Sequence, residues 1–193
     1  MTPPDVETDR TPTRSNSGPI PGHAVSLSLK DALEAALRED IGFGDLTVDT
    51  VLPESRERGV FLAKAPGVLA GLQAIALGYQ LLDPAVSVNL LMKDGDKVAA
   101  GDPVAEVEGP VSALLTGERV ILNTLQHLSG IATATAGAVE AVGEQGPRIC
   151  DTRKTLPGLR LLQKYAVRCG GGFNHRFRLD DGVMIKDNHI VAA

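Results

Sequence analysis

The sequence RICDTRKTLPGLRLLQKYAVRCGGGFNHRFRLDDGVMIKDNH, residues 148–189, decides the fold class that we predict. Its first residues, 148–150, indicate a short buried strand, and Pro157 suits the first turn of a helix that ends at the triple glycine 170–172. The apolar run 183–185 indicates the next strand. The core face of the helix between them is expected to hold Leu159, Leu162 and Ala166. A strand, a helix and a strand over about 35 residues form one βαβ unit, the unit from which α/β barrels and open α/β sheets are built.

Polar side chains follow both predicted strands. The cluster 151–155 leaves the end of the first strand, 186–189 leaves the end of the second, and 174–176 lies between them. Ligands of barrels and open α/β sheets bind at this end of the strands, so we expect the three clusters to face one site. The basic residues of the clusters are Arg153, Lys154, Arg176 and Lys186, with His175 and His189. Arginine binds carboxylates through two parallel hydrogen bonds and lysine suits phosphates, so the clusters predict an anionic substrate.

Charge is unevenly distributed along the chain. Residues 151–189 hold eight Lys and Arg against four Asp and Glu, whereas the 193-residue chain holds 19 against 24 and has a net charge of −5. The acidic balance argues against a general nucleic-acid binder, and the basic segment favours a small anionic ligand. Within that segment, Arg160, Lys164 and Arg168 are well explained as the solvated face of a helix.

The cysteines, the lengths of the apolar runs and the first residues of the chain indicate the cellular compartment. Cys150 and Cys169 cannot form a disulfide framework, and we interpret both as small core residues. No apolar run approaches the roughly 18 residues that cross a bilayer. The first residues lack the basic and apolar stretches of a signal peptide. We therefore expect a cytoplasmic protein with neither a membrane nor a nucleic acid as its partner.

The first half of the chain predicts a separate α+β domain. Residues 1–24, rich in Pro, Ser and Thr, indicate a disordered tail. A capping pattern at 28–31 begins a helix that stops near 41–42, where a turn follows. Another helix is expected at 71–82. Strands are expected at 58–64, 67–70, 86–91 and 103–108.

A long helix over about 116–142 separates this region from the βαβ unit. Its core face is expected to hold Ile121, Leu125, Leu128, Ala132, Ala136 and Val139. The pattern of elements therefore predicts an α+β region over residues 25–115, followed by an α/β region over residues 116–193.

Three motifs resemble the quinolinate phosphoribosyltransferase family, whose members are also named nicotinate-nucleotide pyrophosphorylase (carboxylating). They are Asp151-Thr-Arg-Lys-Thr-Leu-Pro-Gly158, Gly170-Gly-Gly-Phe-Asn-His-Arg176 and Met184-Ile-Lys-Asp-Asn-His-Ile190. The segments 39–47, 67–71 and 117–132 add to the resemblance, which runs from about residue 27 to 193 in the family's order. It implies the fold class that we expect: an α+β N-terminal sandwich domain, residues 25–115, followed by the start of an incomplete α/β barrel, residues 116–193. It also implies a homodimer or larger assembly.

The resemblance also implies an activity. Quinolinate and phosphoribosyl pyrophosphate would give nicotinate mononucleotide, pyrophosphate and CO2 on the route to NAD, with Mg²⁺ required. Arg153, His175 and Arg176 are expected to contact the two quinolinate carboxylates. Arg119 is expected to reach the site of the neighbouring subunit of a homodimer.

Further roles follow from the same resemblance. Lys154 and Lys186, the expected catalytic residues, should lie near the sugar phosphates and the substrate carboxylate. Thr152 should offer backbone contacts to the substrate. These seven residues make up the predicted site.

The chain departs from the family pattern in two places. Residues 176–180 read RFRLD, where the family more often has a small or neutral residue in the middle. The family's acidic Mg²⁺ ligands and its glycine-rich phosphate loop would lie beyond Ala193, so we expect little or no turnover from this chain. The alternatives are a remnant that at most binds quinolinate or a partner subunit, a paralogue with another nitrogenous acceptor, and a carrier domain at 94–108.

Overall fold

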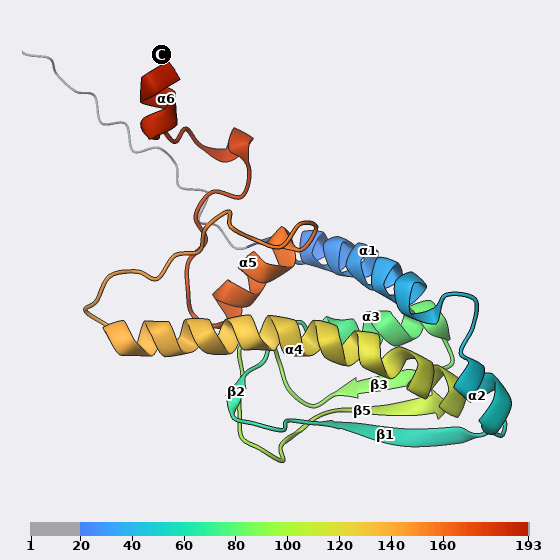
Figure 1. Cartoon of the computed structure of the whole chain (residues 1–193). Helices are drawn as coiled ribbons and strands as arrows, with labels where there is room; N and C mark the ends of the chain where they lie inside the picture. Colours follow the sequence, from blue (N-terminus) through green and yellow to red (C-terminus); the bar gives the residue numbers. More distant parts are fainter. Residues whose placement is uncertain (1–19, 193) are drawn as a thin grey trace, which may run out of the picture.

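One long helix organises the molecule. The computed structural model describes residues 20–192, and helix α4 (Val111–Val142) runs through their middle (Figure 1). Helices α1 (Gly22–Ile41) and α5 (Arg160–Cys169) lie on one side of α4, and the strands lie on the other. The predicted core face is confirmed for four residues: Ile121, Leu125, Leu128 and Ala132 are buried. The helix begins at Val111 rather than at 116.

A small antiparallel sheet covers one side of α4. Its strand order is β1 (Arg56–Leu62), β5 (Pro103–Pro110) and β3 (Ser87–Leu90), and Val107 of the central strand pairs with Gly59 on one side and Val88 on the other. Two further short strands, β2 (Gly67–Val68) and β4 (Lys97–Val98), pair with each other. Strands β1, β2, β3 and β5 lie within the four predicted ranges or overlap them, and β4 lies outside these ranges.

The apolar core has two parts. One lies between α1, α4, α5 and helix α3 (Gln73–Leu82), where Leu33 and Ala132 are fully buried. The other lies between α3, α4 and the sheet, where Ile75 and Ala105 are fully buried. Because α3 and α4 contribute to both parts, the sheet and α5 are held on one continuous support.

Helix α1 corrects the predicted limit of the N-terminal tail. The tail was expected to reach residue 24, and residues 1–19 lie outside the described part of the chain, but residues 22–24 already belong to α1. The reason is Val25, which is buried in the same stripe as Leu29, so the apolar repeat starts one turn before the capping pattern at 28–31.

The short helix α2 was not predicted from the sequence. Asp45 caps α2 (Leu46–Val51) by accepting a hydrogen bond from the Val48 N–H at 3.0 Å, in a segment that we expected to be only a turn. The same carboxylate accepts a hydrogen bond from the Thr116 hydroxyl at 3.0 Å. Asp45 therefore ties α2 to α4, a contact between residues far apart in sequence.

The βαβ unit was predicted with the wrong second strand. Cys150 forms an isolated parallel bridge with Phe173, so the return segment starts directly after the glycines that follow α5. Residues 183–185 form no strand, and Val183 and Ile185 are exposed because the described residues bring no neighbouring strand to them. Cys150 itself is exposed, so it is not the core residue that we expected.

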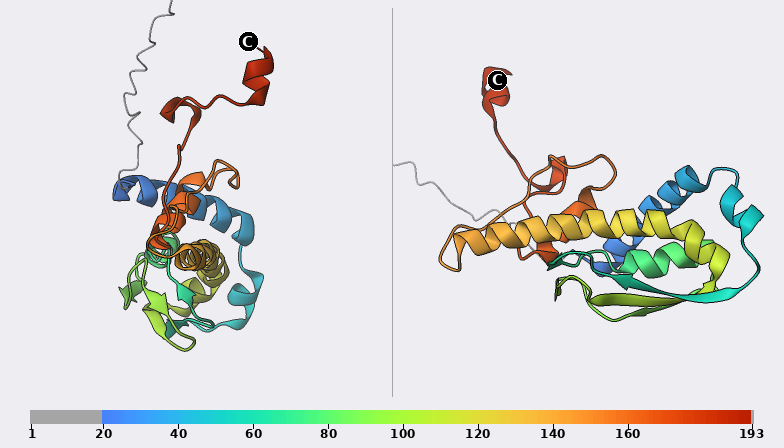
Figure 2. Two further views of the ribbon diagram at one scale, coloured as in Figure 1. Left: turned by 90° about the vertical axis from the view of Figure 1, so that its left-hand side faces the viewer. Right: turned by 60° about the horizontal axis from the view of Figure 1, so that its bottom comes forward.

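The last described residues extend away from the rest of the molecule. A 3-10 turn, η1 (Leu179–Asp181), is followed by α6 (Asp187–Ala192), and Figure 2 shows α6 standing apart from α4 and α5. None of the helices between residues 20 and 192 is long and apolar enough to cross a membrane.

Candidate active site

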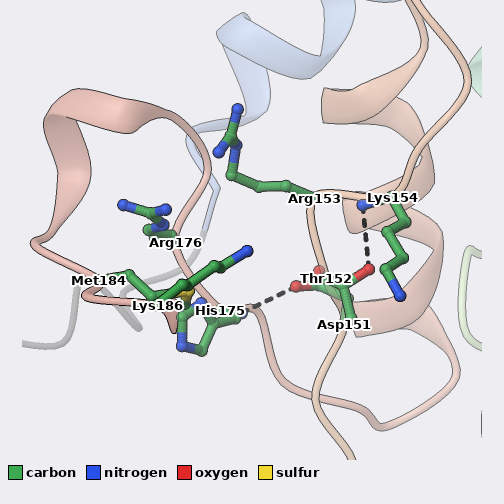
Figure 3. A pocket seen from close by; sticks show the side chains of 8 residues that line it. All are labelled: Asp151, Thr152, Arg153, Lys154, His175, Arg176, Met184 and Lys186. Carbon is green, nitrogen blue, oxygen red and sulfur yellow. Dashed lines mark hydrogen bonds between the residues drawn. The ribbon is translucent and has the colours of Figure 1, made fainter. Parts of the chain in front are cut away.

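Three separate segments line one open cavity of about 500 Å³. Residues 151–154 follow the parallel bridge, residues 175–176 follow the glycines, and Met184 and Lys186 come from the extended segment before α6. In Figure 3 the side chains of 151–154 lie on one side of the opening and those of the other two segments lie on the facing side. The structure brings residues of all three predicted clusters to this cavity, although His189, in α6, does not line it.

Six of the seven predicted site residues line this cavity. They are Thr152, Arg153, Lys154, His175, Arg176 and Lys186. The seventh, Arg119, lies on an exposed part of α4 and does not line it. Two lining residues were not predicted, Asp151 and Met184.

Four positive side chains and a single carboxylate line the cavity. Arg153, Lys154, Arg176 and Lys186 are the cations, and Asp151 is the carboxylate. In both arginines the Nε–H is buried and has no hydrogen-bond partner among residues 20–192. A buried donor without an acceptor is costly, so each Nε–H still requires one. The Nη1 of Arg176 already donates to the Gly182 carbonyl at 2.5 Å.

Asp151 faces inward although it lies among cations. Its side chain is only 8% exposed; Oδ2 accepts a hydrogen bond from Asn174 Nδ2 at 2.6 Å, and Oδ1 accepts one from the His175 N–H at 2.8 Å. Its charge is balanced by an ion pair between Oδ1 and Lys164 Nζ. The carboxylate therefore holds the cavity wall together and is not available to a ligand.

The buried position of Lys164 corrects the sequence analysis, which placed it on a solvated helix face. Its side chain is fully buried, and its ammonium group also donates to the His175 carbonyl at 3.0 Å and lies 4.8 Å from the ring centroid of Phe177. Because the apolar residues of α5 lie on one face, Lys164 on the other face was expected to be solvated. The segments 150–151 and 173–177 cover that face too.

The other two basic residues of α5 also bind backbone. Arg160 donates to Thr155 Oγ1 and to the Phe177 carbonyl, both at 3.1 Å. Arg168 donates to the Gly172 carbonyl at 3.3 Å, and its guanidinium lies 5.4 Å from the ring centroid of Phe173. The predicted solvated face of α5 is thus a surface that fixes the loops on both sides of the cavity.

The second cysteine is protected from reaction. Cys169 lies at the end of α5, and burial, followed by the charge of Asp94, raises the pKa of its thiol from 9.0 to about 11. At neutral pH the thiol stays protonated, so it is no nucleophile. Tyr165 beside it donates a hydrogen bond to Asp94 Oδ2 at 2.7 Å, and this bond fixes the turn that begins the 94–108 segment against α5.

A metal ion does not fit the described residues. No group of three or more His, Cys, Asp or Glu residues within 20–192 is arranged to hold one. Asp151, the carboxylate in the cavity, already accepts hydrogen bonds on both oxygens. We therefore derive no step through Mg²⁺ from this part of the chain.

Comparison with protein families and known proteins shows which proteins this chain is similar to. Two family models match the chain: quinolinate phosphoribosyl transferase, N-terminal domain, over residues 45–129, and the C-terminal domain of the same family over residues 131–193. The models adjoin inside α4, whereas the predicted domain boundary lies at 115/116, also within that continuous helix.

Curated relatives carry matching names. A probable nicotinate-nucleotide pyrophosphorylase (carboxylating) of Bacillus subtilis is 53% identical over 167 residues, which cover 86% of this chain and 58% of the relative. A nicotinate-nucleotide pyrophosphorylase (carboxylating) of Mycobacterium leprae is 43% identical over 171 residues, 85% of this chain and 59% of the relative. The chain thus spans a little under 60% of the length of these relatives.

Solved structures of the same kind share the fold. NadC from Streptococcus pyogenes superposes with a TM-score of 0.82 at 48% identity, over 86% of this chain and 60% of that one. The nicotinate-nucleotide pyrophosphorylase from Francisella tularensis gives a TM-score of 0.84 at 37% identity, over 91% and 62% of the two chains. These matches confirm the predicted fold class, a sandwich domain followed by the start of a barrel.

Proposed function

Because the chain belongs to the quinolinate phosphoribosyl transferase family, we propose that its cavity binds quinolinate and phosphoribosyl pyrophosphate. The transfer would yield nicotinate mononucleotide, pyrophosphate and CO2. The observation that carries this proposal is the gathering of four cations from three separate segments around one cavity. Quinolinate is a dianion and its co-substrate is more highly charged, so a site for both must supply several positive charges.

The residues divide between the two anionic substrates. Arg153, His175 and Arg176 are assigned to the two carboxylates of quinolinate, since an arginine can hold a carboxylate through two parallel hydrogen bonds. The unpartnered Nε–H groups of both arginines support this assignment. Lys154 and Lys186, both exposed, are assigned to the phosphates and the substrate carboxylate as the catalytic pair.

Two further lining residues complete the assignment. The hydroxyl of Thr152 accepts the Lys154 N–H at 3.0 Å, which shapes the loop whose backbone would contact the substrate. Met184 supplies an apolar side chain to the same cavity, suited to the face of a pyridine ring.

The chemistry needs positioning more than proton transfer. The lone pair of the pyridine nitrogen forms a bond to the anomeric carbon as the bond to the pyrophosphate oxygen breaks, and the electron pair leaves with pyrophosphate. Loss of CO2 then leaves an electron pair on the ring carbon, which takes up a proton. Fixed cations hold both anions in line and stabilise the charge on the leaving group.

Two expectations need partners beyond the described residues of a single chain: a neighbouring subunit and a metal ion. We place Arg119 at the cavity of a neighbouring subunit in a homodimer, because it is exposed and lies away from its own cavity. We also retain Mg²⁺ as the cofactor implied by the family, held by groups other than those of residues 20–192.

Calorimetric titration of the full chain with quinolinate tests the substrate assignment. Arg153→Met should weaken binding by about tenfold or more, the value of a charge-assisted hydrogen bond. Arg178→Met is the matched control: Arg178 is 76% exposed, is paired with Asp180 and lies outside the cavity, so affinity should stay within about twofold.

A second measurement separates the transferase from a binding-only remnant. The chain is mixed with quinolinate, phosphoribosyl pyrophosphate and Mg²⁺, and nicotinate mononucleotide is measured by chromatography. Quinolinate binding with product supports the transferase. Binding without product supports a remnant that binds quinolinate. An absence of binding contradicts the transferase and leaves only a remnant that binds a partner subunit.

A further inference from the structure

The buried ion pair between Asp151 and Lys164 lies behind the cavity and connects its two facing sides. Asp151 immediately precedes residues 152–154, which we name the first arm. Residues 175–176 form the second arm. Figure 3 shows the arms on facing sides of the opening. Any group that holds both arms from behind sets the distance between their cations.

The peptide groups of His175 are held from both ends by this pair. Its N–H donates to Asp151 Oδ1 at 2.8 Å, and its carbonyl accepts from Lys164 Nζ at 3.0 Å. With N–H and carbonyl both fixed, the backbone of the second arm has little freedom to rotate.

Asn174 closes the network. Its side-chain amide donates to Asp151 Oδ2 at 2.6 Å and to the Lys164 carbonyl at 2.8 Å. The third side of the Lys164 ammonium faces the ring of Phe177. Every polar group of the pair therefore has a partner, the condition under which a buried ion pair specifies one arrangement.

The pair also keeps the cavity positive. An unpaired Asp151 carboxylate would oppose the charges of the lining cations and repel an anionic ligand. Lys164 cancels that charge from a fully buried position, without reaching into the cavity itself. It is thus a positioning residue, not a catalytic one.

We propose that the Asp151–Lys164 pair, completed by Asn174, fixes the spacing of the two arms and thereby makes the cavity prefer a ligand with two carboxylates to one with a single carboxylate. This rests on the proposed function, since the ligand is quinolinate. Two arms at a fixed distance engage two anionic groups at once, whereas loosened arms bind each group separately and lose the advantage of preorganisation.

The test compares variants of the full chain. Lys164→Met alone strands a buried carboxylate and should lower the urea midpoint of unfolding. The double variant Asp151→Asn with Lys164→Met removes both charges, so its midpoint should return toward that of the wild type. Its His175 carbonyl has lost a donor, and the single side-chain oxygen of the introduced asparagine cannot serve all the former donors. Asn174→Ala is a milder variant that removes only the closing bonds.

Removal of both charges from an exposed pair provides the matched control. Arg58 and Glu108 form an ion pair of 2.7 Å on the sheet, and Arg58→Met with Glu108→Gln removes it far from the cavity in sequence and structure. This control should change neither the ligand preference nor the local dynamics of the second arm.

Two readouts are needed. Calorimetry gives the ratio of the dissociation constants of nicotinate, with one carboxylate, and quinolinate, with two. Hydrogen exchange by NMR gives the protection of the His175 amide in the absence of ligand. In the double variant, the ratio of the nicotinate to the quinolinate dissociation constant should fall by about tenfold. The protection of the His175 amide should also fall by about tenfold, the value of one charge-assisted hydrogen bond. Asn174→Ala should lose part of each.

The outcomes separate this proposal from the proposed function. A folded double variant with wild-type protection and a wild-type ratio overturns the positioning role. A wild-type chain that binds neither ligand overturns the quinolinate assignment and the preference with it. In that case the exchange measurement still decides the positioning role: lost protection supports it, and unchanged protection contradicts it.

Discussion

Replacement of Gly170 with alanine should force α5 away from α4. Gly170 is buried at the end of α5, and a Cβ added there would lie 2.3 Å from the Ala132 carbonyl oxygen and 2.7 Å from Thr135 Cβ. The backbone of Gly170 has φ −79° and ψ 5°, which alanine also adopts, so the clash alone decides the outcome.

The size of the effect follows from this geometry. An ordinary carbon–oxygen contact is about 3.3–3.6 Å, so the helices must separate by about 1 Å at this point. The oxygen belongs to helix backbone and cannot rotate aside. Overpacking of this kind costs about 1–3 kcal/mol, and in a chain of this size 2 kcal/mol lowers Tm by about 4–8 °C.

Urea unfolding followed by circular dichroism is the assay, because the chain contains no Trp. Gly130→Ala is the matched control: the same substitution within α4, where an added Cβ meets nothing within 4 Å. The better helix propensity of alanine should raise stability by about 0.5–1 kcal/mol there. Equal midpoints for Gly170→Ala and the wild type would refute the close approach of α5 to α4.

Three further outcomes are expected. Tyr165→Phe removes the hydrogen bond to Asp94 between α5 and the turn before β4, and should cost about 1–2 kcal/mol in urea unfolding. Burial raises the pKa of Cys169 to about 11 and that of Tyr79 to about 12. Because both values exceed those of the unfolded chain, the contribution of these two groups to stability should be constant up to about pH 9 and should be lost as the pH rises toward 11–12, which denaturation at stepped alkaline pH measures. Thr133→Val leaves the N–H of the second residue of β2 without its acceptor and should cost about 1–2 kcal/mol by thermal unfolding.

Regular apolar spacing predicted most of the helices correctly. Leu29, Leu33 and Leu37 recur on one face of α1, and Leu125 and Leu128 belong to the stripe of α4; all five are buried. Apolar residues that recur with the helical period indicate a helix with one buried face. These helices are each buried mainly on one face, so the prediction succeeded. The prediction was wrong for 183–185, because an apolar run does not show whether a neighbouring strand is present to pair with it.

The residues that line the cavity were predicted better than Lys164, the buried residue that holds the cavity wall in place. Three of the four lining cations, Arg153, Lys154 and Arg176, lie in the loops on either side of α5, so their order along the sequence already brings them near one another. Lys164 was missed because α5 is covered on two sides, and the second cover, near Phe177, folds back from residues beyond the helix. One signal was present: Asp151 precedes two cations and needs a buried counter-charge if it follows a strand inward.

Helix α4 determines where this chain can be divided. At about 1.5 Å per residue its 32 residues form a rod of about 48 Å, and it carries both the sheet and α5. A break at 115/116 or near 130 would cut the rod and leave each fragment with an uncovered apolar stripe. The exposed loop at 143–148, after the rod, is the place where two co-expressed fragments could reassemble, with the helix and sheet in one piece and the arms of the cavity in the other.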